Sequence, residues 1–340
     1  MSHPVNLYCT LWELPELDFP HTLLGKRDSQ DPDLAEHLRG FVGFVTQGGT
    51  RPMSATLYHV IQHIQRVQNH LSVQVEAEHL DAMSDWAMRA NALIFLPDAS
   101  VRDPAGLVLV SGKDGASNPD AQVPYPPDAV ARKQSTDAFL AEKGIRVPPS
   151  LPPVLGAGEL ALRDPEELVA RALALMSVSV YAEGLHSGQP IPAQEIQARL
   201  SGADLSPSEA SFLATEAPQT QDIVNHAWRY EALAVVLWAL GHLPELPWPD
   251  QIADVPTLAK TVFELGEKGL LARAAVRSES EVLDALDLHL RLHWAAREAG
   301  RKQESPPAGL HPGVLMERHG ALNWITCWHD ADWDEIDTPT

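Results

Sequence analysis

Two pairs of histidines have a spacing that can hold a metal ion. His59 and His63 are four residues apart, as are His289 and His293, so each pair shares a face if its segment is helical. A zinc site also needs a third ligand, and a zinc protease with this spacing needs the glutamate of an HExxH motif, which neither pair has. We therefore expect no metal and no cofactor at these histidines. The face of the first pair continues to an arginine and a further histidine, so we expect it to be solvated.

Charged side chains stand beside apolar stripes in three segments of the second half of the chain. Such charges are either solvated flanks or a buried network, and buried charges must pair because an isolated one is costly. We expect Glu231 and Asp287 each to pair with an arginine, and Arg291 has the right spacing for Asp287. A structural network is one interpretation of this set, and a catalytic or ligand-binding cluster is the other. The candidate residues are Arg229, Glu231, Asp284, Asp287, Arg291, Glu317, Arg318 and His319.

Tryptophan is concentrated in the same region. Seven of the nine tryptophans lie after residue 220, close to the charges described above. A cluster of aromatic side chains either lines a binding groove or packs in a helical core, and both interpretations stay open here. The candidates for an aromatic surface or core are Trp228, Trp294, Trp324 and Trp333.

One glycine-rich stretch, GAGELA at Gly156–Ala161, matches a loose dinucleotide-binding fingerprint. That fingerprint functions between a strand and the start of a helix, where the pyrophosphate meets the helix N-terminus. Here several prolines precede the stretch, and the next helix-capping residue is Asp164. We therefore expect no nucleotide site.

The local structure around the second histidine pair decides how its side chains point. The segment LHLRLHW alternates apolar and polar residues like a strand. It lies, however, in a run without Gly or Pro that follows a capping box starting at Ser278 and ends at Gly300. These signals predict a helix. Similar start signals at Asp164 and Ser206 predict that the region after residue 130 is almost wholly helical.

The first third of the chain mixes strand-like and helix-like patterns. Helical spacing of apolar residues predicts helices that begin near residue 53 and cover residues 81–89. Alternation and short apolar runs predict strands near residues 5–12, 71–78, 91–97 and 106–110.

A change in composition marks the boundary between these two regions. Residues 111–129 are rich in Gly, Pro, Ser and Asp, which predicts a linker. The chain has 340 residues, enough for two domains of ordinary size. We therefore predict an α+β N-terminal domain over residues 1–110, followed by a mostly all-α C-terminal domain over residues 130–340.

The charge of the chain excludes one class of partner. Lys and Arg total 25 against 46 Asp and Glu, which gives a net charge of -21. Nucleic-acid binding requires a positive surface, so we expect no binding of DNA or RNA. A neutral or basic protein fits this charge better as a partner. The sequence leaves the oligomeric state open.

Other general features favour a cytoplasmic protein. The first residues lack the basic region and long apolar run of a signal peptide. The apolar stretch from Ala232 to Leu240 is about half the length that a membrane helix needs, so we expect no membrane association. Cys9 and Cys327 are far apart in the sequence, which argues against a disulfide framework and a cysteine-rich metal site.

Five spaced motifs resemble the domain-of-unknown-function family numbered 4272, over about Arg132 to Thr338. They are RKQSTDAFLAEKGIRVPPSLP, WRYEALAVVLWALG, EVLDALDLHLRLHW, MERHGALNW and WDEIDT. The resemblance implies a bacterial, mostly helical domain without an established activity. The residues that form the pattern are Trp228, Arg229, Glu231, Trp238, Asp284, Asp287, Arg291, Trp294, Glu317, Arg318, His319, Trp324, Trp333, Asp334, Asp337 and Thr338.

Two functions are compatible with this sequence. The first is an interaction or accessory module without chemistry of its own. The alternative is a small-ligand-binding protein or an enzyme that uses the Glu, Arg, Asp and His cluster of the helical region. A deep pocket lined by that cluster favours the alternative, whereas a filled core with the charges paired to one another favours the module.

Overall fold

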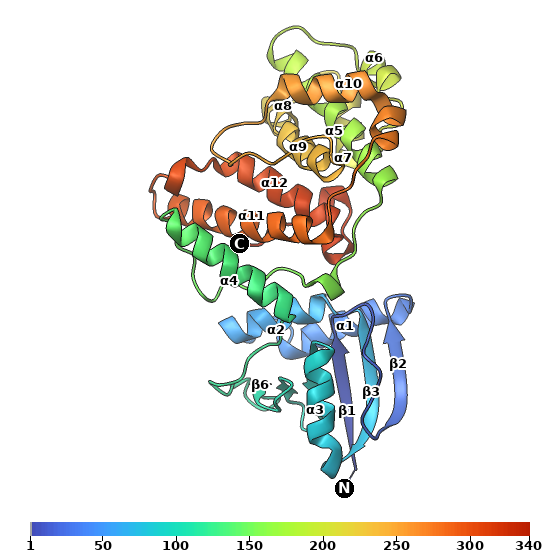
Figure 1. Cartoon of the computed structure of the whole chain (residues 1–340), viewed down its shortest axis with the longest axis vertical. Helices are drawn as coiled ribbons and strands as arrows, with labels where there is room; N and C mark the ends of the chain where they lie inside the picture. Colours follow the sequence, from blue (N-terminus) through green and yellow to red (C-terminus); the bar gives the residue numbers. More distant parts are fainter. Residues whose placement is uncertain (1) are drawn as a thin grey trace. The chain divides into compact units, whose positions relative to one another are not determined.

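The computed structural model describes residues 2–340 and divides into two compact units. The chain up to Ala131, together with Leu155–Leu160, forms the first unit, called here the sheet unit. Arg132–Val154 and Ala161–Thr340 form the second, the helical unit. Figure 1 shows an antiparallel sheet with helices in the first part of the chain and helices throughout the second part. The expected fold class is confirmed.

The sheet unit is built on six antiparallel strands in the order β2-β3-β1-β4-β5-β6. The predicted strands and helices of this region all occur, with shifted ends. The strands are β1 (Ser2–Cys9), β2 (Thr22–Asp28), β3 (Asn69–Glu76), β4 (Ala92–Phe95), β5 (Val101–Arg102) and β6 (Val108–Val110). The helices are α1 (Pro32–Val45), α2 (Ala55–Gln65) and α3 (Leu80–Arg89).

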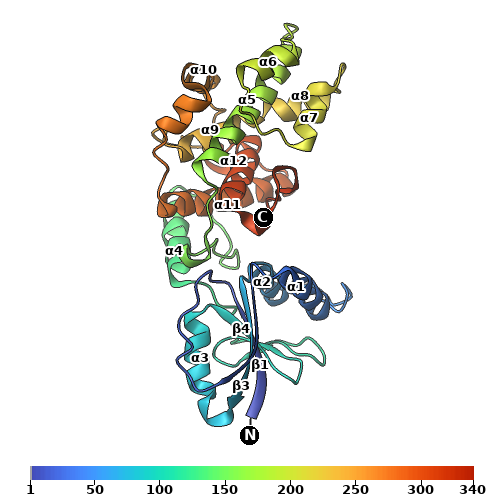
Figure 2. The ribbon, with the colours of Figure 1, turned by 90° about the vertical axis from the view of Figure 1, so that its right-hand side faces the viewer.

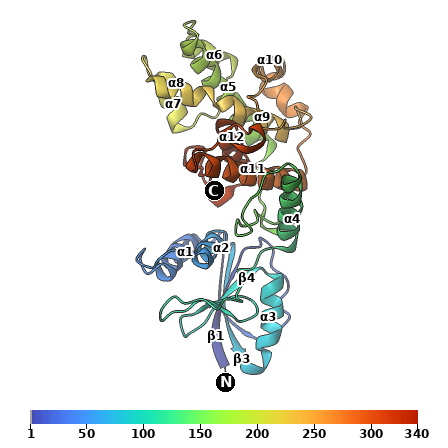
Figure 3. The same cartoon turned by 90° about the vertical axis from the view of Figure 1, so that its left-hand side faces the viewer.

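Both faces of this sheet are covered by helices. Side chains alternate along β1, so Val5 and Leu7 point to one face and Tyr8 to the other. The face of Val5 packs against Trp86 of α3, while the face of Tyr8 packs against α1 and α2. Figures 2 and 3 show the sheet between α3 on one side and α1 and α2 on the other.

The first histidine pair does not lie on a solvated face, so that prediction is wrong. His63 is fully buried, and its Nε2 lies 3.1 Å from the carbonyl oxygen of Tyr8. His59 Nδ1 lies 2.8 Å from the hydroxyl of Tyr125. Helix α2 packs on the sheet along this side because Val60 and Ile64 flank the histidines and are fully buried.

The segment predicted as a linker is held against the sheet unit in this structure. Ser117 Oγ donates a 2.7 Å hydrogen bond to the carbonyl of Leu109, and the backbone N–H of Gln122 donates to Asp103 Oδ2. Val123 packs against the core beneath α2. Helix α4 (Pro127–Glu142) begins inside the predicted linker and continues into the helical unit. The domain limits drawn from the sequence stay a prediction.

The GAGELA stretch has a packing role. Gly156 lies so close to Pro126 that an added Cβ would stand 2.4 Å from the Cβ of that proline. The buried carboxylate of Glu159 accepts hydrogen bonds from the Gly156 N–H at 2.7 Å and from Arg66 and Asn91 at 3.3 Å. The stretch therefore fastens the returning chain to the sheet unit.

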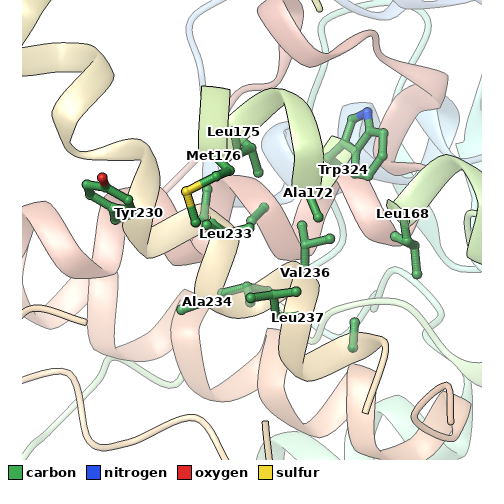
Figure 4. Packing of buried hydrophobic residues seen from close by; sticks show 14 of the residues in the cluster. Leu168, Ala172, Leu175, Met176, Tyr230, Leu233, Ala234, Val236, Leu237 and Trp324 are labelled. Carbon is green, nitrogen blue, oxygen red and sulfur yellow. The ribbon is translucent and has the colours of Figure 1, made fainter. Parts of the chain in front are cut away.

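Helices α5 and α9 form the centre of the helical unit. Helix α9 is buried from Tyr230 to Ala239 and packs against α5 and α12. Figure 4 shows side chains of α5 and α9 facing one another, among them Met176 and Leu233. The helices are α5 (Pro165–His186), α6 (Ala193–Arg199), α7 (Pro207–Ala214), α8 (Thr220–Ala227), α9 (Arg229–Ala239), α10 (Val255–Ala272), α11 (Glu279–Arg301) and α12 (Pro312–Ile325).

The start signals read from the sequence coincide with these helices. Asp164, Ser206 and Ser278 each form a complete capping box at the start of α5, α7 and α11. The LHLRLHW segment lies inside α11, so the helical interpretation is confirmed.

Helix α5 is long and apolar enough to cross a membrane, with a mean hydropathy of 1.4 over its best window. Of that window, 78% is buried inside the protein. This burial is typical of the core helix of a helical domain.

Candidate functional site

The predicted polar cluster divides into separate ion pairs. The first joins Asp287 and Arg291 within α11, with Arg291 Nε 3.0 Å from Oδ2 and a terminal nitrogen 2.7 Å from Oδ1. Both side chains are 0% exposed. Arg291 Nε also lies 3.3 Å from Asp137 Oδ1, which connects α11 to α4. This pair is a structural link with no opening to solvent.

The second pair connects α9 and α12. Arg318 donates from Nε to Glu231 Oε2 at 3.0 Å, and its Nη1 donates to the carbonyl of Pro247 at 2.7 Å. The other oxygen of Glu231 accepts a hydrogen bond from the backbone N–H of Ala253. Both charged side chains are buried, so the pair fixes the 247–253 segment beside the two helices.

The third pair, Arg229 and Glu317, differs because it reaches solvent. The two side chains meet at 2.8 Å, and the Arg229 side chain is 31% exposed, against 6% for Glu317. Burial raises the pKa of the Glu317 carboxyl, and the Arg229 guanidinium opposes that rise. The pair therefore stands at an opening in the helical unit.

Two predicted members lie apart from these pairs. Asp284 is 63% exposed and pairs with Arg132 at 2.9 Å on the surface. His319 is buried, and its Nδ1 lies 3.1 Å from Nδ1 of His293. The structure thus does not bring all eight candidates to one place.

The buried histidines of α11 and α12 are held in their neutral forms. Burial lowers the pKa of His289 and of His293 to about 4 each, and it lowers that of His319 well below the usual range. Arg318 and Arg297 add positive charge near them. Within residues 2–340, no group of three or more His, Cys, Asp or Glu side chains is arranged to hold a metal.

A cavity of about 450 Å³, called here the polar cavity, opens beside the third ion pair. Three of the five motifs noted in the sequence meet there, through α9, α12 and the segment after Trp333. Its lining includes three carboxylates, of Glu317, Asp334 and Asp337, and one cation, Arg229. The remaining lining residues are Ser208, Asn225, Trp228, Met316, Gly320, Ala321, Trp333, Ile336 and Thr338.

Hydrogen bonds and ring contacts fix the wall of the polar cavity that Trp333 and the residues after it form. Two guanidinium groups lie over the Trp333 ring, that of Arg171 at 4.8 Å and that of Arg229 at 5.6 Å from its centroid. Asp334 accepts hydrogen bonds from the hydroxyls of Ser206 at 2.7 Å and Ser208 at 2.6 Å. Although burial opposes ionisation, these bonds lower the pKa of Asp334. A charged carboxylate is therefore held at this wall.

A second cavity, called here the apolar cavity, has a volume of about 270 Å³. Trp228 lines both cavities and stands where α8 ends and α9 begins. An added Cβ on Gly313 would lie 3.0 Å from the Trp228 ring, so the glycine allows a close approach there. The other lining residues are His186, Ile223, Val224, Ala227, Tyr230, Glu231, Ile252, Ala253 and Val255.

The four tryptophan candidates divide between cavities and core. Trp228 and Trp333 line cavities, as the groove interpretation requires. Trp324 is buried, meets Trp333 edge to face at 5.5 Å and carries Arg163 over its ring at 4.7 Å. Trp294 is half-buried and packs on the apolar core, so these last two serve packing.

The region that holds the cavities also matches a known family. The family model described as Domain of unknown function (DUF4272) matches residues 132–336. The lining residues of both cavities fall within this match, except Asp337 and Thr338 just beyond its end. No curated protein and no solved structure matches the chain.

Proposed function

We propose a binding function for this chain, which belongs to the DUF4272 family of domains of unknown function. Its helical unit holds a positively charged group of a partner protein in the polar cavity. The observation that carries this proposal is the excess of carboxylates in the lining, where Glu317, Asp334 and Asp337 stand against the single cation Arg229. Arg229 is already matched by Glu317 at 2.8 Å, so the lining carries two further negative charges, of which Asp334 is also hydrogen-bonded by Ser206 and Ser208.

The overall charge supports a basic or neutral partner. A net charge of -21 speeds the approach of a positively charged protein and disfavours an acidic one. An arginine or lysine side chain suits the cavity because its nitrogen donors form charge-assisted hydrogen bonds to carboxylates. We also propose that the encounter takes place in the bacterial cytoplasm, where thiols such as those of Cys9 and Cys327 stay reduced.

The arrangement supports binding without chemistry better than catalysis. Arg291 and His319, which an enzyme built on the predicted cluster would use, are buried and line neither cavity. Within residues 2–340, the polar cavity has no histidine or cysteine in its lining to act as a general base or nucleophile. We therefore infer an interaction module whose ion pairs stabilise the fold.

Calorimetric titration with N-acetyl-arginine amide tests the proposed cation site. We expect this probe to bind and its neutral analogue N-acetyl-glutamine amide not to bind. Asp337→Asn is expected to weaken binding of the arginine probe about tenfold, because one charge-assisted hydrogen bond is lost. Raising the salt concentration is expected to weaken binding to the unaltered protein as well.

Asp332→Asn is the matched control for this variant. Asp332 lies on the same segment, is exposed, makes no side-chain capping bond and does not line the polar cavity. It removes the same charge and is expected to leave the affinity within about twofold. Equal binding of the arginine and glutamine probes would rule out the cation site.

A further inference from the structure

The apolar cavity has no role in the binding of a cation. Its walls are formed by side chains of α8, of the α8–α9 junction and of the 252–255 segment, and most of them are apolar. Ile252 stands at this cavity with 64% of its surface exposed. Ile252 therefore adds apolar surface at this cavity.

The side chains of Glu231 and Tyr230 at this cavity are already bonded within the protein, while His186 is exposed to solvent. Glu231 receives hydrogen bonds from Arg318 and from the backbone of Ala253. The Tyr230 hydroxyl donates to Glu183 Oε2 at 2.7 Å. A charged or strongly polar occupant would lose its water and find only the His186 ring as a partner, so the cavity favours an apolar group.

Trp228 places this apolar space directly next to the polar cavity. Its side chain lines both, and its backbone is fixed because its N–H donates to Val224 at 3.2 Å and its carbonyl accepts from Glu231 at 3.0 Å. The ring of His311, 5.2 Å away, and the close approach of Gly313 hold the indole in place. The two cavities therefore share the wall that Trp228 forms.

We propose that the two cavities together recognise a dipeptide feature of a basic partner protein, an arginine or lysine adjacent to an aliphatic residue such as leucine. The basic side chain enters the polar cavity, and the aliphatic side chain enters the apolar cavity. The apolar volume of about 270 Å³ exceeds the size of one leucine side chain. This inference rests on the proposed function, because it concerns the same cation site. It adds which kind of residue lies next to the basic residue of the partner protein.

Titration with four capped dipeptides tests the inference. The probes are N-acetyl-leucyl-arginine amide, N-acetyl-arginyl-leucine amide and the two counterparts with glycine in place of leucine. We expect one leucine probe to bind about tenfold more tightly than its glycine counterpart, which is the gain from burying part of a leucine side chain. Both glycine probes are expected to bind like N-acetyl-arginine amide.

Variants in which the apolar cavity is filled test whether the leucine side chain binds there or elsewhere on the protein. Ala227→Phe places a ring in the apolar cavity and is expected to abolish the leucine gain while arginine-amide binding persists. Val224→Phe fills the same cavity from the preceding turn and serves if the first variant does not fold. Ala214→Phe, at an exposed position of α7 outside both cavities, is expected to keep the full gain.

Each outcome decides between the two proposals. A leucine gain that disappears only in the filled variants supports the inference. Equal affinity of leucine and glycine probes, with arginine-amide binding intact, overturns the inference and leaves the proposed function standing. A leucine gain that survives in Ala227→Phe or Val224→Phe places the contact elsewhere and overturns the inference too. If no arginine probe binds, both proposals fail.

Discussion

Replacing Arg291 with alanine is expected to lower the free energy of unfolding of the helical unit by about 3–5 kcal/mol, because it leaves a buried carboxylate without its partner. Both Arg291 and Asp287 are 0% exposed, and two nitrogens of Arg291 bond the two oxygens of Asp287 at 3.0 and 2.7 Å. Alanine removes both bonds and the contact with Asp137 of α4. Urea unfolding followed by the helical circular-dichroism signal measures the loss.

An exposed pair with the same helical spacing provides the control. Arg199 and Glu195 of α6 meet at 2.8 Å, but their side chains are 67% and 49% exposed. Arg199→Ala is expected to cost less than about 1 kcal/mol. Replacing both members of the buried pair by apolar residues, Asp287→Leu with Arg291→Met, is expected to recover most of the loss. A cost for Arg291→Ala as small as that for Arg199→Ala would show that the pair contributes little.

The spacing of residues within one helix determines which ion pairs of the polar cluster can be predicted from the sequence. The pair of Asp287 and Arg291 follows from four-residue spacing on a helix with clear start and stop signals. Glu231 meets Arg318, but the sequence only restricts its partner to a few arginines. Which arginine reaches it depends on how α9 and α12 pack, and residue spacing across such distant segments carries no information on that.

The polar cavity is even harder to predict from the sequence than the ion pairs. Its wall at Trp333 depends on Arg171, Ser206 and Ser208, none of which stands out as a site residue in the sequence. The two serines are part of a capping motif, which accounts fully for their presence at the start of α7. Their bonds to Asp334 arise only because the end of the chain folds back over that helix start. A contact between a capping serine and an acidic residue far away in the sequence leaves no detectable sequence pattern.

In the sheet unit, the elements missed from sequence lack the usual signals. Strand β2 is an edge strand with most side chains exposed, and its register shifts between Leu23 and Gly25, so alternation is lost. Helix α1 does have a capping aspartate at Asp31 followed by Pro32, a readable start signal. The prediction for His63 is wrong because polar neighbours on a helix suggest a solvated face, whereas this histidine is buried and bonds a backbone carbonyl of β1.

Lowering the pH from about 7.5 to about 5 is expected to destabilise the helical unit by about 2 kcal/mol for each of His289 and His293. Burial lowers the pKa of each to about 4, whereas an exposed histidine in the unfolded chain titrates near 6.5. Below pH 6.5 the unfolded state therefore binds more protons than the folded state. The stability is fully present above that pH and is lost as the pH falls toward 4.

The contacts around His289 and His293 explain why these two rings resist protonation. His293 and His319 face each other at 3.1 Å through their Nδ1 atoms, so one donates and the other accepts, and a second proton would place two donors together. A charged His289 would stand near Arg318, and a charged His293 near Arg297, and within residues 2–340 no carboxylate is bonded to either histidine. The added charge is thus left without compensation.

Variants separate these histidines from the other groups that titrate in acid. His289→Asn with His293→Asn retains short amide groups in place of the two rings but does not titrate, so the loss of stability between the two pH values should shrink by about 4 kcal/mol. His186→Asn, at an exposed position on α5, is the matched control for replacing a histidine by asparagine. The helical signal is the one to follow, because burial also lowers the pKa of His63 in the sheet unit to about 3. If the double variant loses stability in acid as steeply as the unaltered protein, His289 and His293 are not the source of the acid sensitivity of the helical unit.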